Sequence, residues 1–145
     1  MEVKKIAIGS DHAGFDLKES VIKHLKNKGI EVEDFGPFND ERADYPDYAH
    51  PVANAVTKKE VDLGILICGS GNGINMTANK HQEIRSALCW QNDIAEMARL
   101  HNNANIIALP ARYLSEELAL ECVDTFISTD FEGGRHEGRV AKISC

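Results

Sequence analysis

The feature that most constrains the fold is an almost continuously apolar run, VDLGILIC, at residues 61–68. A strand with one solvated face alternates apolar and polar residues, whereas a strand covered on both faces is apolar throughout. Shorter runs rich in β-branched residues occur at 4–9, 30–35, 84–90 and 105–110. Five such runs predict a parallel sheet buried between two layers of helices.

Amphipathic stretches of helical length separate these runs. The predicted helices cover residues 14–29, 47–58, the stretch from the glycine loop to about 80, 92–102 and 115–129. Pro51 is compatible with the second helix only near its first turn. The alternation predicts a three-layer, Rossmann-like, doubly wound sheet of five parallel strands with helices on both faces. We interpret residues 1–145 as a single domain whose last part, 131–145, is a basic tail.

Charge and cysteine usage exclude several classes of protein. The formal net charge of −7 argues against a general nucleic-acid or anionic-membrane binder, and no apolar run reaches membrane-spanning length. The four cysteines lack metal-ligand spacing, which predicts free thiols in a reducing cytoplasm and no metal site. Cys89 and Cys122 fall within apolar patterns and are predicted to be core residues.

Ligands of open parallel sheets bind at the carboxyl ends of the strands. Residues that follow the predicted strands, or end the helix after one of them, are therefore the candidates for a site. The side chains expected at this edge are Asp11, His12, Cys68, His101, Asn102 and Arg112. A thiol, two imidazoles, a carboxylate and a guanidinium form a set typical of catalysis.

The loop CGSGNG at residues 68–73 matches neither well-known nucleotide motif. It lacks the lysine of a P-loop, and Ile74 stands where GxGxxG requires its third glycine. Two interpretations remain for the glycines: a tight strand-to-helix turn, or a nest of N–H groups that binds an anion. Cys68 is either an inert core cysteine or a reactive thiol whose pKa the loop and the helix N-terminus lower.

The remaining candidates each have a structural and a functional interpretation. His12 and His101 are either packing and capping residues or acid–base catalysts. Arg135 and Arg139, four positions apart in GGRHEGRV, lie on one face if the tail is helical. They form either a solvated helix face or a clamp for phosphate.

Five motifs, taken together and in order, resemble one enzyme family. They are IAIGSDHAGFDLK near the start, DYPDYA at 44–49, GILICGSGNGINMTANK at 64–80, ARLHNNANI at 98–106 and GGRHEGRV at 133–140. The chain resembles ribose-5-phosphate isomerase type B, whose family also contains the galactose-6-phosphate isomerase subunits. The resemblance implies an enzyme of the pentose phosphate pathway. Such an enzyme interconverts ribose 5-phosphate and ribulose 5-phosphate through a cis-enediolate, without metal or other cofactor.

The resemblance also implies a role for each matching residue. Cys68 matches the base that moves a proton between C1 and C2, Ser70 the hydroxyl that supports it, and His101 the residue that opens the furanose ring. The glycine loop matches the backbone amides that bind the enediolate. The resemblance therefore implies that the phosphate of the substrate binds to the arginines and not to the loop. The implied substrate-binding residues are Asp11, His12, Tyr45, Gly69, Ser70, Gly71, Asn72, Gly73, Asn102, Arg112, Arg135 and Arg139.

Two properties of the family concern the base and the tail: a subgroup that uses a different base, and active sites shared between subunits. One subgroup replaces the cysteine with serine and uses a glutamate at the position of Ile74, so the presence of Cys68 favours the cysteine form. Family members are homodimers or homotetramers with shared active sites. The resemblance therefore implies that the tail at 131–145, hinged at Gly133 and Gly134, serves a neighbouring subunit.

Three alternatives stay open at this point. Within the same chemistry, the substrate is a hexose phosphate such as allose 6-phosphate or galactose 6-phosphate. In a different class, the chain is a non-catalytic phosphosugar-binding module that uses the loop and the arginines for recognition only. A redox protein built on Cys68 lacks a resolving cysteine nearby in the sequence.

Overall fold

Five parallel strands form one sheet in the computed structural model, which describes residues 1–145. The strands are β1 (Lys5–Ser10), β2 (Glu31–Asp34), β3 (Leu63–Cys68), β4 (Ser86–Leu88) and β5 (Ile106–Pro110). Their order in the sheet is β2-β1-β3-β5-β4, and every neighbouring pair is parallel. All six residues of β3 are buried, as its apolar sequence predicts.

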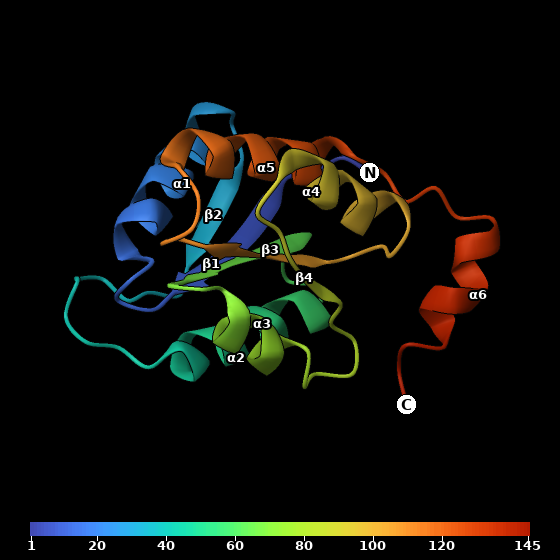
Figure 1. Cartoon of the computed structure of the whole chain (residues 1–145), viewed down its shortest axis with the longest axis horizontal. Coiled ribbons are helices and arrows are strands. Elements are labelled where there is room, and N and C mark those ends of the chain that lie inside the picture. The colour runs from blue at the N-terminus through green and yellow to red at the C-terminus, as the bar shows by residue number, and fades with distance from the viewer.

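Helices cover both faces of the sheet, which confirms the predicted three-layer fold (Figure 1). One face is packed against α1 (Phe15–Asn27), α4 (Asn92–Leu100) and α5 (Glu116–Ser128). The other face is packed against α2 (Tyr45–Thr57) and α3 (Asn72–Ala78). A sixth helix, α6 (Arg135–Ala141), lies outside both layers at one end of the molecule.

Local signals account for most helix boundaries, with one correction. Gly29 follows α1 in the left-handed region at φ +79°, and the Ser115 hydroxyl accepts the Leu118 N–H at the start of α5. The predicted start of the second helix at residue 47 is wrong, because Pro46 occupies the first turn and α2 begins at Tyr45. Pro51 consequently lies inside α2 and not in its first turn.

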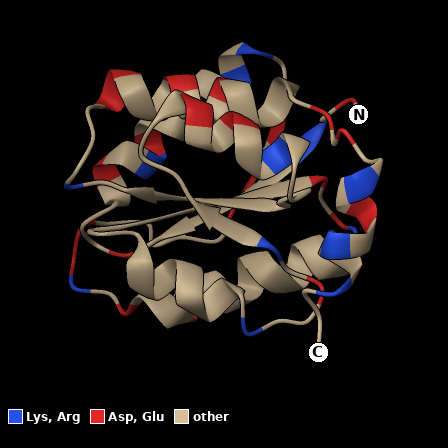
Figure 2. Ribbon diagram, turned by 45° about the vertical axis from the view of Figure 1, so that its right-hand side comes forward, with Lys and Arg blue, Asp and Glu red and all other residues tan.

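The two helical layers differ in charge (Figure 2). The helices α1, α4 and α5 carry eight acidic side chains, whereas α2 and α3 together contain a single charged residue, Asp47. None of the helices combines the length and the apolar character needed to cross a membrane.

Two cysteines lie in the apolar core between the sheet and α5, as the sequence predicts. Cys89 and Cys122 are fully buried and neither forms a disulfide. Burial raises the pKa of the Cys89 thiol from 9.0 to about 12 and that of Cys122 to about 11. The neutral thiol is therefore strongly preferred in the folded protein.

These pKa shifts predict a loss of stability at alkaline pH. Above about pH 9 the unfolded chain releases its thiol protons while the folded protein keeps them, so the free energy of unfolding falls until the pH reaches the folded pKa values. Each thiol contributes a slope of about 1.4 kcal/mol per pH unit. Urea unfolding at several pH values measures the slope. Cys122→Ala is expected to reduce the slope, whereas Cys145→Ala, at an exposed cysteine, is expected to leave it unchanged. Equal slopes in the wild type and both variants would contradict the prediction.

Candidate functional site

Cys68 ends β3 at the edge of the sheet where ligands of this architecture bind. The strand order reverses between β1 and β3, because β1 continues outward to β2 and β3 to the strands on the other side. Asp11 follows β1 directly, and its backbone N–H donates to the Ile67 carbonyl at 3.1 Å. The end of β1 and the end of β3 are thus tied together beside the Cys68 thiol.

The glycines that follow Cys68 allow two other groups to approach the backbone closely. A β-carbon at Gly73 would lie 2.5 Å from the ring of Tyr45, and one at Gly69 would lie 3.0 Å from the guanidinium of Arg112. The Arg112 N–H also donates to the Gly69 carbonyl at 3.0 Å. The loop therefore lies between an aromatic ring and a cation, both of which are predicted site residues.

Gly71 carries the strongest backbone constraint in this loop. Its φ is +77°, and a β-carbon there would overlap Leu88. Gly71→Ala is therefore expected to lower the free energy of unfolding by at least about 1–2 kcal/mol, from the left-handed backbone alone. It should also reduce turnover of the substrate proposed below, because the loop amides move.

The matched control for this substitution is Gly138→Ala. That glycine lies in α6 with nothing within 4 Å of its would-be β-carbon, and alanine there is expected to leave stability unchanged or slightly higher. Urea unfolding and steady-state kinetics compare the two variants. A Gly71→Ala protein as stable and active as the wild type refutes the constraint.

Of the two interpretations of Cys68, the thiol with a lowered pKa is not the one found in the single chain. The backbone N–H groups of Ile74, Gly71 and Ser70 do stabilise the thiolate. Burial acts more strongly in the opposite direction, since the side chain is only 4% exposed, and the carboxylate of Asp11 adds to it. The net result is a raised pKa, so the neutral thiol of Cys68 is preferred at neutral pH.

A pocket of about 470 Å³ opens beside the loop. Its lining residues are Ser70, Asn72, Leu88, Trp90, Pro110 and Tyr113. The Ser70 hydroxyl accepts hydrogen bonds at 3.3 Å from the backbone and the side-chain amide of Asn72. Trp90, which ends the predicted strand 84–90, and Tyr113, which comes shortly after the predicted strand 105–110, were not predicted, although the rule for strand ends applies to both.

His12 lies at the same edge, under the loop formed by residues 36–44. Its Nδ1 lies 3.2 Å from both the backbone nitrogen and the carbonyl oxygen of Ala43. The loop is held by Asp34, which accepts the Gly36 N–H and pairs with the fully buried Lys18 at 2.8 Å. The Asp11 carboxylate accepts the Gly14 N–H at 3.0 Å. Asp11, His12, Tyr45, Cys68 and Arg112 are thus brought together as expected.

His101 and Asn102 do not lie at this edge, which corrects the sequence analysis. They follow α4, and a few residues later Asn105 accepts the Gly64 N–H at the opposite end of β3. Gly64 and Cys68 are separated by roughly 13 Å along the strand. Asn102 instead lines a separate pocket of about 500 Å³ together with Lys80, Arg85 and the C-terminal residues 143–145.

The tail joins His101 at this opposite edge. The buried Arg99 donates to the carbonyl oxygens of Thr129 and Ala104, and the Glu132 N–H donates to the carbonyl oxygen of Leu100, the last residue of α4. Beyond Glu132 the chain forms α6, which projects away from the layers (Figure 1). The tail is helical, which was the condition for Arg135 and Arg139 to share a face: both lie in α6 and both are exposed.

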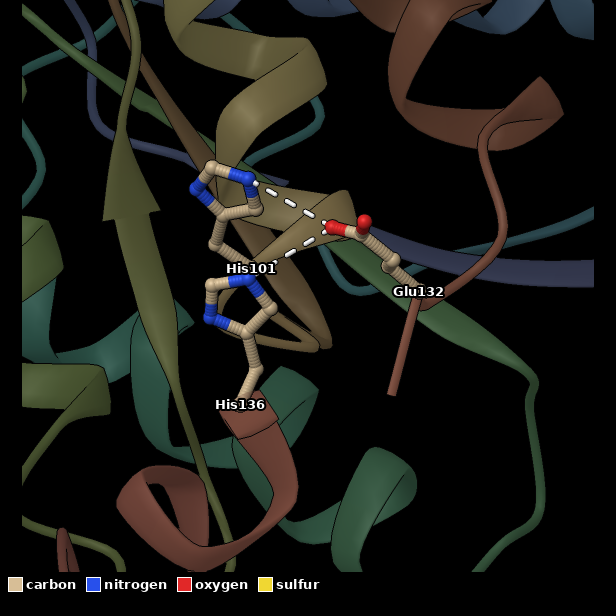
Figure 3. A group of neighbouring side chains, drawn as sticks. All are labelled: His101, Glu132 and His136. Carbon is tan, nitrogen blue, oxygen red and sulfur yellow. Dashed lines mark ion pairs between the residues drawn. The ribbon is translucent and has the colours of Figure 1, made fainter. Parts of the chain in front are cut away.

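His136 packs against His101 in a way that the sequence analysis did not foresee. The two rings are stacked with centroids 4.2 Å apart, and Glu132 lies beside both (Figure 3). Desolvation, followed by the positive charges of His101 and Arg135, lowers the pKa of His136. The four-residue spacing of Glu132 and His136 was a usable signal, but nothing in the sequence connects them with His101.

Comparisons with known proteins show the family to which the chain belongs. The sequence profile described as Ribose/Galactose Isomerase matches residues 6–143. The chain belongs to this family. Ribose-5-phosphate isomerase B of Escherichia coli strain K12 is 47% identical over 142 residues, which are 98% of this chain and 95% of that protein.

Solved structures of the family agree with the fold described above. A ribose 5-phosphate isomerase from Thermotoga maritima superposes with a TM-score of 0.96 at 54% identity, covering 99% of both chains. Ribose-5-phosphate isomerase B from Mycoplasma genitalium, solved with bound ribulose 5-phosphate, gives 0.93 at 43% identity and covers 99% of this chain and 95% of that one. The resemblance seen in the five sequence motifs is confirmed.

Proposed function

We propose that this member of the ribose/galactose isomerase family interconverts ribose 5-phosphate and ribulose 5-phosphate, with Cys68 as the base. The observation that carries the proposal is the position of Cys68. Its thiol lies at the ligand-binding edge of the sheet, next to backbone N–H groups that stabilise negative charge. The names of the family members compared above support the choice of substrate.

The chemistry starts from the open-chain aldose. The thiolate of Cys68 removes the proton from C2, the electron pair forms the C1–C2 double bond, and the negative charge moves to O1. The amides of the loop at residues 69–73 donate to this developing oxyanion, which is charged only in the intermediate and the transition states that flank it. The proton on O2 then passes to O1, Cys68 returns its proton to C1, and the ketose results. Ser70, at the loop's surface, supports the base.

Substrate-binding roles follow from the groups around the loop. Asp11, His12 and Tyr45 face the sugar hydroxyls, and Asn72 lines the pocket beside them. The Arg112 guanidinium lies against Gly69 and provides one charge for the phosphate. In one subunit, however, His101, which the family resemblance assigns to ring opening, does not lie at this edge, and neither do Arg135 and Arg139.

A second copy of the chain completes the site. In the proposed homodimer, or in a homotetramer, one subunit contributes to the Cys68 site of its partner the residues His101, Asn102, Arg135 and Arg139. Two observations support this arrangement: α6 projects from the body with both arginines exposed, and the α2–α3 layer carries one charged residue, a composition that suits an interface. The four free cysteines fit a cytoplasmic enzyme.

Isomerisation of ribose 5-phosphate in excess EDTA tests the proposal, with allose 6-phosphate measured in parallel. We expect turnover of the pentose phosphate that is faster than that of the hexose phosphate and is not reduced by the chelator. Faster turnover of allose 6-phosphate would support the proposed mechanism but would show that the substrate is a hexose phosphate. Absence of turnover with either sugar, combined with binding of both, would indicate a phosphosugar-binding module.

A further inference from the structure

The side chains of His101, Glu132 and His136 form a cluster with the composition of a metal site (Figure 3). Nε2 of His101 lies 3.6 Å from Glu132 Oε2, and Nε2 of His136 lies 3.5 Å from the same oxygen. One ligand atom from each of the three residues lies within 4.8 Å of the other two. Two imidazoles and a carboxylate are the protein ligands of many open zinc sites.

An independent observation points to a ligand at this cluster. His136 is only 6% exposed, and its Nε2 is buried without a hydrogen-bond partner. Buried polar atoms are nearly always paired, because leaving one unpaired costs about 1–3 kcal/mol. This nitrogen faces the Glu132 carboxylate at 3.5 Å, and the His101 ring is stacked on its own ring, so the unpaired atom belongs to the cluster itself.

We propose that His101, Glu132 and His136 bind a first-row transition-metal dication of the Zn²⁺ class. Bond lengths of about 2.0–2.2 Å in a tetrahedral site place neighbouring ligand atoms about 3.3–3.6 Å apart. Both histidine–glutamate separations have this value already. The histidine–histidine separation closes by rotation of the His101 ring out of the stack, which its 38% exposure permits, and a fourth position remains for water.

The consequence for catalysis rests on the proposed function, in which His101 opens the furanose ring. A nitrogen lone pair that coordinates a metal cannot accept a proton, so the ion withdraws this base from the reaction. The metal is thus an inhibitor of an isomerase that needs none. The neighbouring guanidiniums of Arg135 and Arg139 repel a dication, which makes binding weaker than at a structural zinc site and reversible.

Zinc titration of the metal-free protein tests the proposal with two separate readouts. ZnCl₂ is expected to inhibit turnover of ribose 5-phosphate at least tenfold at saturation, and excess EDTA should restore it. CoCl₂, titrated without substrate, should give the visible absorption of tetrahedral Co²⁺ bound to nitrogen and oxygen. Glu132→Gln and His136→Asn are each expected to weaken both effects by about 100-fold or more, since even the loss of a group that only supports a metal ligand costs up to 100-fold.

The control variant is His50→Asn, which breaks the other close histidine pair, His50 and His81, at 2.7 Å. It should behave as the wild type in both readouts. Inhibition that persists undiminished in Glu132→Gln, as expected for zinc bound at Cys68, overturns the proposal, and so does the absence of a Co²⁺ spectrum. Glu132 is half exposed, so this variant remains informative if His136→Asn fails to fold. A wild type without isomerase activity in EDTA would refute the proposed function alone, because the Co²⁺ spectrum still decides whether the cluster binds metal.

Discussion

Cys68→Ala is expected to lower kcat for ribose 5-phosphate by about 10³-fold, within the range that a positioned general base contributes. Alanine keeps the small apolar volume at the end of β3 but cannot carry a proton between C2 and C1. Exchange of the C2 proton with D₂O, followed by NMR, should disappear in the same variant, while binding of the sugar phosphate is nearly unchanged. The control is Cys145→Ala, which removes an exposed thiol far from the loop.

The pH dependence of the alkylation of Cys68 tests the protonation state of its thiol. Because burial raises the pKa of this thiol above 9.0, little thiolate is present at neutral pH in the free protein. Alkylation by iodoacetamide should be slow at neutral pH, accelerate as the pH rises through the alkaline range, and be prevented by bound ribose 5-phosphate. Unchanged turnover in Cys68→Ala removes this residue from the mechanism, and rapid alkylation at neutral pH contradicts the raised pKa.

Mixing two inactive variants is expected to restore activity if the site is shared between subunits. In a heterodimer of Cys68→Ala and His101→Asn, one site carries both substitutions and the other carries neither. Random exchange of subunits makes half of the dimers mixed, so the mixture should recover about a quarter of wild-type activity. The physical reason is that Cys68 and His101 lie at opposite ends of the sheet in each chain.

Coexpression of the two variants with different affinity tags isolates the mixed dimer for steady-state kinetics. A mixture of Cys68→Ala with Ser70→Ala is the matched control, because both positions lie on the same loop and no exchange of subunits creates an intact site. Lack of recovery in the first mixture, with mixed dimers present, places the complete site within one chain. A monomeric protein in solution would refute the shared site directly.

Short-range patterns account for what could be predicted of the fold. The apolar run of β3, the glycine after α1 and the serine before α5 each act through burial or backbone hydrogen bonds within a few residues. For the same reason, residues that directly follow a strand were placed at the right edge of the sheet. Asp11, His12, Cys68 and Arg112 belong to this group; their catalytic and binding roles stay predictions.

His101 was misplaced because it follows a helix and not a strand. In a parallel sheet the connecting helix runs back along the strands, so its end lies at the opposite edge. The nine residues of α4 span about 14 Å, enough to return the chain to the level at which β5 begins. The signal was available, since the length of the helix was predicted and its direction follows from the topology.

The sequence by itself determined the class of fold and the family, because both depend on local spacing and on motifs, and it supplied the candidate site residues. Only the tertiary structure decided how those residues are grouped: Cys68 with Tyr45 and Arg112 at one edge, and His101 with the tail at the other. It also decided the direction of the Cys68 pKa shift. That direction is the difference between a burial cost and the stabilisation by backbone N–H groups, and both depend on how segments distant in the sequence pack around one sulfur atom.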